Sequence, residues 1–133
     1  MRKKRKPKSP RALLKAKVWK ACSEYVRKRD CDKNGFGKCI TCDTSGHWKE
    51  FHAGHFISGR TNGILFDTRG IRLQCPGCNL YGNGKPIEYL IALEKEMGVT
   101  KARNLRDQLM KKKNTVTTLS MDDLEKLLRK FTK

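Results

Sequence analysis

The first pattern in the chain is a run of apolar residues at helical spacing near its N-terminus. Four of them lie four positions apart: Leu14, Val18, Cys22 and Val26. The lysines and arginines between them fall on other sides of a helix, so residues 10–29 are predicted to form an amphipathic helix with a basic outer face. Ser9 is suited to cap this helix, and Pro10 to begin its first turn.

Three further helices are predicted in the C-terminal half of the chain. Pro86 can open the first of them and Gly98 can close it. Thr100 is expected to cap the second, and Ser120, with Asp123 three residues later, is the capping signal of the third. The expected segments are residues 86–98, 100–113 and 121–131.

The middle of the chain carries a strand pattern instead. Residues 48–57 have the aromatic content and spacing of a β-strand, and residues 71–73 are predicted to be its hairpin partner. Glycine, asparagine, aspartate and cysteine dominate residues 30–47, which predicts loops and turns. A short helix is expected to begin at residues 76–79. With the flanking helices, this order of elements indicates an α+β fold.

The length of 133 residues suits one compact domain. Because only 37% of the residues are hydrophobic, the core is thin and an additional stabilising element is expected. The predicted organisation has four parts: a basic disordered arm (1–9), a basic amphipathic helix (10–30), a central module (31–98) and C-terminal helices (99–133).

Positive charge dominates the composition. Thirty-one lysines and arginines oppose 13 acidic residues, which gives a net charge of +18, and residues 1–20 contain ten basic residues and no acid. This imbalance indicates a polyanionic partner such as nucleic acid. No apolar run is long enough to cross a bilayer, and no signal-peptide core follows the basic N-terminus. We therefore expect an intracellular, cytoplasmic protein without membrane contact.

Four of the six cysteines form two pairs, each with two residues between the thiols: Cys39–Cys42 and Cys75–Cys78. In a reducing compartment such cysteines are more plausible as metal ligands than as disulfides, and two pairs complete a tetrahedral shell for structural Zn²⁺. A redox role for either pair is the alternative. Cys22 is expected to pack in the core, whereas Cys31 has no assignment.

All three histidines lie between the two cysteine pairs: His47, His52 and His55. We expect His47, in a turn-rich segment, to pack or hydrogen-bond locally. Asn79 directly follows the second cysteine pair, at the start of a helix that must pack across the hairpin carrying His55. An imidazole and an amide oxygen are therefore expected to meet in one small volume.

Several motifs occur together, most of them in residues 39–90: Cys39-x-x-Cys42, His52-Ala-Gly-His55-Phe56, Gln74-Cys75-x-x-Cys78-Asn79, Gly84 and Tyr89-Leu90. This combination resembles the NinG/Rap recombination endonucleases of lambdoid phages, which are HNH (ββα-metal) nucleases. The zinc-stapled layout is also similar to that of phage endonuclease VII. The resemblance covers residues 10–113 and implies a small zinc-stapled HNH module flanked by N- and C-terminal helices.

The resemblance also implies how such a module would work. His55 matches the general base that activates water, and Asn79 matches an oxygen ligand of the catalytic Mg²⁺ or Mn²⁺. The zinc would be structural, because a closed shell of four cysteines has no open position for water. Hydrolysis of DNA would leave a 5′-phosphate and a 3′-hydroxyl.

Two positions depart from the family pattern. His52 stands where an aspartate is common, so it is expected either to ligate the catalytic ion or only to shape the site. Gly70 stands at the place of the middle asparagine, which normally orients the base. Asn62, Asp67 or the backbone is expected to take over that role. Asp67 is also a candidate to supply a missing oxygen ligand to the metal.

Four basic residues near the module are candidates for binding the flanking phosphates: Arg60, Arg69, Arg72 and Lys85. By the resemblance, the substrates are branched recombination intermediates such as Holliday junctions and D-loops, in the host cell cytoplasm if the chain is phage-encoded. Symmetric cleavage of a junction requires two active sites, so a homodimer is expected. The apolar face of residues 10–29 or of 121–131 would provide the contact.

Two alternatives remain open at this point. A non-catalytic zinc-knuckle protein that binds nucleic acid would explain the charge and the cysteines, but it would leave His52, His55 and Asn79 without a role. A nonspecific or nicking HNH nuclease would share the site and differ only in its substrate.

Overall fold

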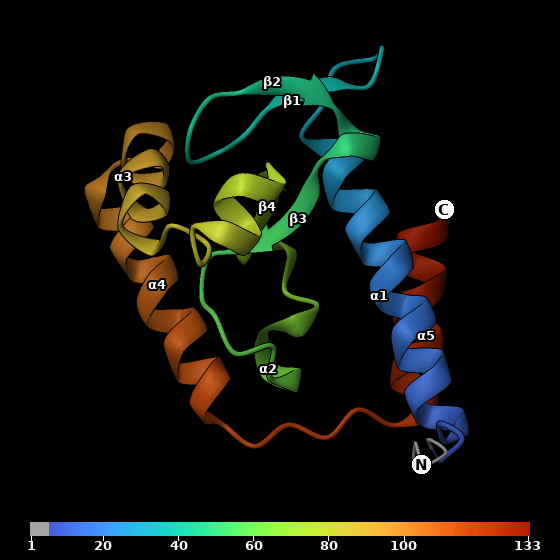
Figure 1. Ribbon diagram of the computed structural model, residues 1–133. Coiled ribbons are helices and arrows are strands. Elements are labelled where there is room, and N and C mark those ends of the chain that lie inside the picture. Colours follow the sequence, from blue (N-terminus) through green and yellow to red (C-terminus); the bar gives the residue numbers. More distant parts are fainter. Residues whose placement is uncertain (1–5) are drawn as a thin grey trace, which may run out of the picture.

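The computed structural model describes residues 6–133 (Figure 1). Helices α1 (Pro10–Arg29) and α5 (Met121–Thr132) pack side by side along one flank of the molecule. Helices α3 (Pro86–Met97) and α4 (Val99–Asn114) form a second pair on the opposite flank. Two small antiparallel sheets lie between the helix pairs, so the predicted mixture of helices and small sheets is confirmed.

Helix α1 begins as the sequence predicts. The side chain of Ser9 accepts a hydrogen bond from the backbone N–H of Ala12 at 3.2 Å, and Pro10 is the first helical residue. Residues 6–9 of the expected basic arm are exposed and form no regular element. Residues 1–5 of that arm lie outside the described residues.

The three C-terminal helices are confirmed, with one shift of a boundary. Gly98, at φ 93°, ends α3 and also precedes α4, which therefore begins at Val99 and is not capped by Thr100. Ser120 and Asp123 form the predicted capping box, with both hydrogen bonds at 3.0 Å. None of the helices in the described part of the chain is long and apolar enough to cross a membrane.

The prediction of loops alone over residues 30–47 is wrong. Strand β1 (Phe36–Lys38) pairs antiparallel with β2 (Ser45–His47) in a small sheet. Each strand has three residues with a glycine at its centre, Gly37 opposite Gly46. Such strands have no alternation of apolar and polar side chains, so the sequence carries no strand signal.

The strand predicted over residues 48–57 is shorter than expected. Trp48–Glu50 form a 3₁₀ turn, and strand β3 covers only His52–His55. Its predicted partner is confirmed as β4 (Ile71–Gln74), which pairs antiparallel with β3. The register places the residues of β3 opposite those of β4 from one end to the other: His52 faces Gln74 and His55 faces Ile71.

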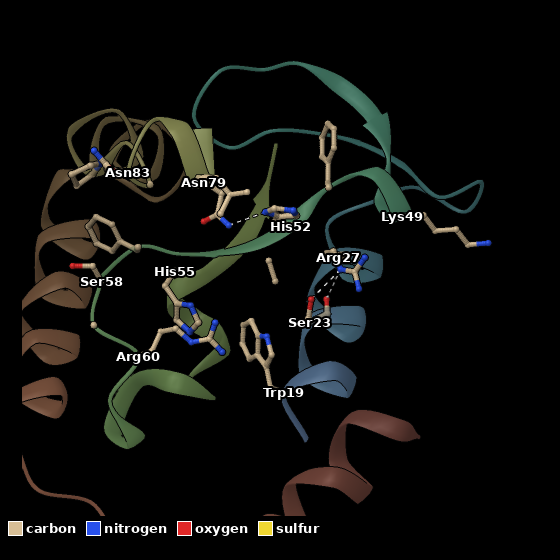
Figure 2. A pocket seen from close by; sticks show the side chains of 17 residues that line it. Trp19, Ser23, Arg27, Lys49, His52, His55, Ser58, Arg60, Asn79 and Asn83 are labelled. Atoms are coloured by element: carbon tan, nitrogen blue, oxygen red, sulfur yellow. Dashed lines mark hydrogen bonds between the residues drawn. The ribbon is translucent and has the colours of Figure 1, made fainter. Parts of the chain in front are cut away.

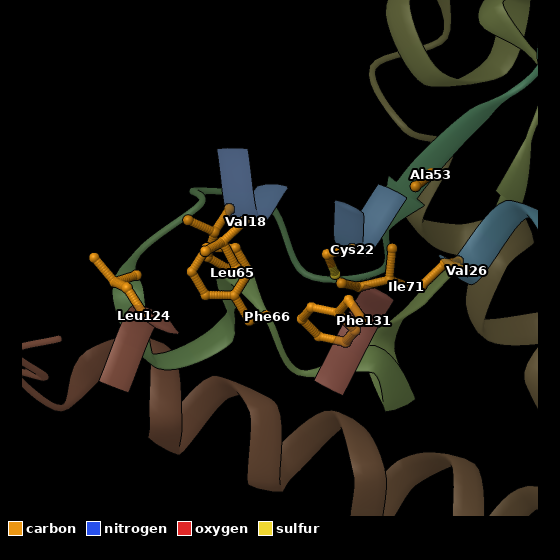
Figure 3. Close-up of a cluster of buried hydrophobic side chains, with 9 residues drawn as sticks. All are labelled: Val18, Cys22, Val26, Ala53, Leu65, Phe66, Ile71, Leu124 and Phe131. Atoms are coloured by element: carbon orange, nitrogen blue, oxygen red, sulfur yellow. The ribbon is translucent and has the colours of Figure 1, made fainter. Parts of the chain in front are cut away.

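The main hydrophobic core joins α1 to α5 and to the β3–β4 hairpin (Figure 3). Its buried residues are Val18, Cys22, Val26, Ala53, Leu65, Phe66, Ile71, Leu124 and Phe131. Burial of each large aliphatic or aromatic side chain contributes roughly 1.5–3 kcal/mol to folding. The apolar faces of α1 and α5 cover each other within one chain, and the homodimer contact expected through either face stays a prediction.

A second core lies between α3, α4 and the hairpin, and Tyr89 is at its centre. The ring of Tyr89 is fully buried and stacks on Phe56 with the ring centroids 5.1 Å apart. Its hydroxyl donates a hydrogen bond to the backbone carbonyl of Gly54 at 2.7 Å. The short helix α2 (Asn62–Leu65) packs against α4. These contacts fix β3 from the side of the α3–α4 pair.

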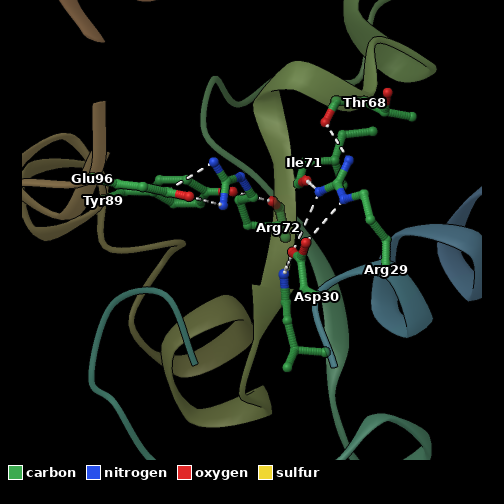
Figure 4. Close-up of polar contacts among 9 residues, drawn as sticks. Arg29, Asp30, Thr68, Ile71, Arg72, Tyr89 and Glu96 are labelled. Atoms are coloured by element: carbon green, nitrogen blue, oxygen red, sulfur yellow. Dashed lines mark hydrogen bonds and ion pairs between the residues drawn. The ribbon is translucent and has the colours of Figure 1, made fainter. Parts of the chain in front are cut away.

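Polar contacts attach the C-terminal end of α1 to β4 (Figure 4). The guanidinium of Arg29 donates to the backbone carbonyls of Thr68 at 3.0 Å and Ile71 at 2.6 Å. The carboxylate of Asp30 accepts from the backbone N–H of Leu73 at 2.9 Å. Helix α1 is therefore anchored to the hairpin by its apolar face and by its last turn.

Candidate metal centre and active site

The four paired cysteines converge on one point. Cys39 and Cys42 lie in the connection between β1 and β2, and Cys75 and Cys78 lie at the start of the π-helical turn η3 (Gly77–Tyr81). Their four Sγ atoms all lie within 4.8 Å of one another, and the Sγ atoms of Cys42 and Cys75 are 3.7 Å apart. Zn–S bonds of about 2.3 Å give a tetrahedral shell with edges of about 3.8 Å. The predicted cluster is confirmed, and its spacing fits a single metal ion such as Zn²⁺.

Hydrogen bonding prepares this cluster for a cation. Burial raises the pKa of the Cys39 thiol, but hydrogen bonds from the backbone of Cys75 and from Thr41 outweigh it and lower that pKa to about 6. The Thr41 hydroxyl lies 3.3 Å from the Cys39 sulfur. All of the cysteines are free thiols. A thiolate at Cys39 therefore provides negative charge where a dication would bind.

The two remaining cysteines and His47 pack against neighbouring residues and are not part of the four-cysteine cluster. Cys22 is fully buried in the main core, as predicted, and burial raises the pKa of its thiol to about 12. Cys31 is half-buried and packs in the apolar cluster beside the four cysteines, outside the metal-binding set. His47 also packs locally: its Nδ1 accepts from the N–H of Lys49 at 3.2 Å, and its ring meets Phe36 edge-on.

An open pocket of about 650 Å³ lies between α1, β3 and the loop that joins η3 to α3 (Figure 2). The structure brings four of the predicted site residues to its wall: His52, His55, Arg60 and Asn79. Arg27 and Lys49 also line it, and none of its lining residues is acidic. The pocket is therefore electropositive and suited to an anionic ligand.

The side chains of His52 and Asn79 are hydrogen-bonded to each other in this pocket. Nδ1 of His52 lies 3.0 Å from the amide nitrogen of Asn79, and both side chains are half-buried (Figure 2). Strand β3 places the histidine. The cysteine cluster places the asparagine, because Cys78 immediately precedes it at the start of η3. An imidazole nitrogen and an amide oxygen are both metal donors, and the atoms that this hydrogen bond leaves free are Nε2 of His52 and the amide oxygen of Asn79.

His55 is oriented by the backbone. Its Nε2 lies 3.1 Å from the carbonyl oxygen of Leu65, so the tautomer with a proton on Nε2 donates there and leaves the lone pair of Nδ1 free. Burial lowers the pKa of His55 and the nearby Arg60 lowers it further, although the bond to Leu65 opposes them. The ring also stacks on Trp19, with centroids 5.1 Å apart and planes at 22°. The imidazole is thus neutral and fixed in direction.

Among the described residues, neither Asn62 nor Asp67 takes the expected role of orienting His55. Gly70 is buried, and a Cβ at this position would lie 2.6 Å from the side chain of Leu109, so a larger residue does not fit without rearrangement. The side chain of Asn62 bonds instead to α1 and to the connection between α4 and α5. Of the alternatives that the sequence left open, the structure places the backbone carbonyl of Leu65 against His55.

Asp67 does not reach the pocket. Its carboxylate forms ion pairs with Arg69 at 2.8 Å and with Lys112 on α4. Burial raises the pKa of Asp67, but hydrogen bonds from these two cations hold it well below its usual range. The structure therefore places Asp67 in an ion-pair network and does not bring it near His52 or Asn79.

Only one of the four predicted phosphate contacts lines the pocket, and that is Arg60. Arg69 forms an ion pair with the carboxylate of Asp67. Arg72 forms an ion pair with Glu96 at 2.9 Å. Lys85 has a left-handed backbone (φ 49°) immediately before α3, outside the pocket lining. Sequence proximity to the module thus did not predict which cations reach the site.

The wall that α1 contributes to the pocket is not predicted from the sequence. Three residues spaced by four line the pocket: Trp19, Ser23 and Arg27. Each of them directly follows a core residue of the same helix, so this face of α1 adjoins the apolar face. A tryptophan on an otherwise basic helix face was the available signal, because a large aromatic side chain is seldom left in solvent.

The fold and the cysteine cluster define the class: a small α+β protein with four cysteines placed to hold a metal ion, beside an open basic pocket. The chain belongs to the NinG family, because the family model described as Bacteriophage Lambda NinG protein matches residues 1–133. The resemblance inferred from the cysteine, histidine and asparagine motifs is confirmed at the level of the family.

Known relatives agree with this membership. The NinG protein of Salmonella phage P22 is 30% identical over 93 residues, which are 68% of this chain and 42% of that protein. The NinG protein of Escherichia phage lambda is 29% identical over 92 residues, 67% of this chain and 42% of that protein. The match therefore spans less than half the length of these relatives. No solved structure matches the chain.

Proposed function

We propose that this protein is an HNH endonuclease that uses a divalent metal ion to hydrolyse phosphodiester bonds in DNA. The observation that carries the proposal is the pocket itself. It combines a neutral, backbone-oriented His55 with the bonded pair of His52 and Asn79, in an electropositive cavity without carboxylates. Hydrolysis of an anionic diester needs a base, a metal site and cations, and the pocket offers candidate residues for each.

The chain supplies the base. His55 accepts a proton from the attacking water at Nδ1, because Nε2–H is engaged by the carbonyl of Leu65. Its lowered pKa keeps it unprotonated at neutral pH, and the stacked ring of Trp19 limits its rotation. Arg60, on the same wall, attracts the phosphate to the site.

The donor set indicates which ion fits. His52 and Asn79 would bind it, and a bound divalent ion would neutralise charge on the phosphate and stabilise the leaving oxygen. Mg²⁺ prefers carboxylate oxygens, whereas imidazole suits transition metals better. Since no acidic residue lines the pocket, we expect Mn²⁺ to support more activity than Mg²⁺, with water and the DNA phosphate completing the coordination.

Family membership adds an expectation about the substrate. By the resemblance to phage recombination endonucleases, branched DNA such as Holliday junctions and D-loops is the proposed substrate. Paired cleavage of a junction favours a homodimer.

One observation favours a second candidate function. The absence of carboxylates from the pocket lining is unusual for a Mg²⁺ site, and it fits a zinc-stabilised protein that binds DNA without cutting it. Such a protein would need the cysteine cluster and the cations but not the unprotonated His55.

A single panel of cleavage reactions separates these functions. Junction, D-loop, flap, nicked and linear substrates are incubated at one salt concentration without divalent ion, with Mg²⁺ and with Mn²⁺. The endonuclease proposal requires metal-dependent products with 5′-phosphates from at least one substrate, and their loss in His55→Ala. Binding of all the substrates without any product, at either metal, would contradict it in favour of the binding protein.

A further inference from the structure

The arginines of the described chain fall into two groups. Five of them form ion pairs with carboxylates: Arg29, Arg69, Arg72, Arg103 and Arg106. The other four form no ion pair within residues 6–133: Arg11 and Arg129 are exposed on α1 and α5, whereas Arg27 and Arg60 line the candidate active site. A pair of cations that share one pocket without a carboxylate repel each other unless an anion is present. Their placement therefore points to an anionic ligand.

Each of these two arginines is supported by a tryptophan. The guanidinium carbon of Arg27 lies 5.1 Å from the ring centroid of Trp48, and that of Arg60 lies 4.7 Å from the ring centroid of Trp19. The chain has only two tryptophans, so each one serves this purpose. A guanidinium stacked on an aromatic face loses less freedom when it binds a phosphate, which favours affinity.

The side chain of Arg27 is also oriented by hydrogen bonds. Its Nε donates to the backbone carbonyl and the hydroxyl of Ser23, at 3.2 Å and 3.1 Å, and its Nη1 donates to the carbonyl of Trp48 at 3.1 Å. Three further N–H bonds of the guanidinium have no partner among the described residues. Lys28 and Lys49 lie against the same ring, at 4.9 Å and 5.7 Å, and add positive charge beside it.

The two arginines mark the ends of the α1 wall. Trp19 and Arg27 are eight residues apart on α1, a rise of about 12 Å at roughly 1.5 Å per residue. A DNA strand rises about 3.4 Å per nucleotide, so the wall is about three to four nucleotides long. Figure 2 shows Arg60 beside His55, whereas Arg27 lies further along the helix at Ser23.

We propose that Arg27 and Arg60 bind two phosphates of one DNA strand, on either side of the phosphate that occupies the candidate active site. Trp48 and Trp19 are the positioning residues for these two guanidinium groups. The flanking arrangement of the two phosphates rests on the proposed endonuclease function, since that function defines the central phosphate. Binding of the strand by the two arginines does not depend on cleavage.

The first test measures DNA binding by fluorescence anisotropy over a series of salt concentrations, with no divalent ion added. Arg27→Ala and Arg60→Ala are each expected to weaken binding about tenfold. Each should also reduce the slope of log K against log salt by about 0.9 on duplex DNA or about 0.7 on a single strand. Arg129→Ala is the matched control, since Arg129 is exposed on α5, outside the pocket. An unchanged slope in both pocket variants would overturn the proposal.

The second test locates the phosphates. Single phosphates of the strand are replaced in turn by neutral methylphosphonates, and the loss of affinity is compared in the unchanged protein and in each variant. The proposal predicts that one position loses its effect in Arg27→Ala and a different position in Arg60→Ala, because the partner is already missing. Additive effects at all positions would contradict direct contact.

The third test concerns the tryptophan support. Trp48→Leu keeps every charge but removes the ring, and is expected to weaken binding about two- to fivefold, with partial recovery in Trp48→Phe. Zinc content and circular dichroism confirm the fold of each variant. If Trp48→Leu bound DNA as tightly as the unchanged protein, Trp48 would have no role in positioning Arg27.

The outcomes for the two proposals are distinguishable. A protein that binds DNA with the predicted changes in slope but produces no cleavage would refute the endonuclease and keep the phosphate contacts. A protein that cleaves DNA while the slopes stay constant would refute the phosphate contacts alone.

Discussion

The cysteine cluster and the histidine pocket adjoin each other at η3, where Cys78 belongs to one and Asn79 to the other. The cluster brings four donor atoms within 4.8 Å of one another and so contains a complete coordination shell. The pocket brings His52 and Asn79 together as candidate ligands and remains open to solvent. A complete shell serves stability, whereas an incomplete one leaves positions for water and substrate. Two adjacent residues of η3 are therefore expected to have different roles: Cys78 in stability and Asn79 in catalysis.

The largest effect is expected from breaking the complete shell. Cys75→Ser should remove the metal and unfold the module. Binding of structural zinc contributes roughly 10 kcal/mol or more in small domains, comparable with the total stability of roughly 5–15 kcal/mol. Zinc content by mass spectrometry and thermal denaturation measure this directly. Cys31→Ser is the matched control, because Cys31 lies outside the ligand set, and equal loss in both variants would contradict the comparison.

The next largest effect is expected on the cleavage rate, with no change in folding. His55→Ala should lower the cleavage rate by about 10²–10⁴-fold, the usual contribution of a general base, and keep the zinc content of the unchanged protein. His47→Gln removes a histidine outside the pocket and should cleave normally. If His55→Ala retained the full rate, the assignment of the base would be wrong.

A carboxylate added to the incomplete shell would sharpen the comparison. His52→Asp introduces the oxygen ligand that Mg²⁺ prefers, so the ratio of Mg²⁺-supported to Mn²⁺-supported cleavage should rise several-fold. The measurement is the initial rate at matched concentrations of each ion. A ratio that stays constant would exclude position 52 from the metal site. His47→Asp, away from the pocket, provides the control for added negative charge.

The smallest expected effect is a shift in pH dependence. Burial and the charge of Arg60 lower the pKa of His55, so cleavage should fall only as the pH drops below about 6.5, the ordinary value for histidine. Arg60→Gln removes one cause and should move this acid limb upward by a few tenths of a unit, as read from the pH profile of kcat/KM. Arg129→Gln should leave the limb in place, and a downward shift in Arg60→Gln would contradict the electrostatic argument.

The same pKa shift has a consequence for stability with a defined sign. A histidine whose pKa is lowered by folding stabilises the native state most when it is neutral in both states, above its unfolded pKa. This contribution is lost as the pH falls through about 6.5 toward the folded value. The loss of stability between pH 7 and pH 5.5, measured by denaturant unfolding, should be smaller in His55→Phe than in the unchanged protein.

Local signals made much of the fold predictable. The caps at Ser9 and Ser120 each involve residues within one helical turn, so the sequence contains the whole arrangement. The cysteine cluster was predictable for a similar reason, because two short loops each present two thiols. Strands β1 and β2 were not, since three-residue strands centred on glycine carry no pattern.

The residues of the site were predictable where residue identity alone indicates a role, and not where a backbone group or a distant partner decides it. His52, His55 and Asn79 share one pocket, as expected. The carbonyl that orients His55 belongs to the backbone of Leu65, which leaves no trace in residue identity. Asp67 was misplaced because its partner Lys112 lies 45 positions away on α4, a distance at which the sequence alone says nothing about pairing.

Helix α1 has two faces with different surroundings. Its apolar face packs on α5 and the hairpin through Val18, Cys22 and Val26. The adjoining face lines the pocket with Trp19, Ser23 and Arg27. Its partner α5 is synthesised about a hundred residues later. A contact that closes so long a loop forms slowly compared with local structure. During translation, we expect the apolar face of α1 to stay partly uncovered until α5 has been synthesised. We expect the order of synthesis, as well as the final fold, to affect when this helix is fully covered.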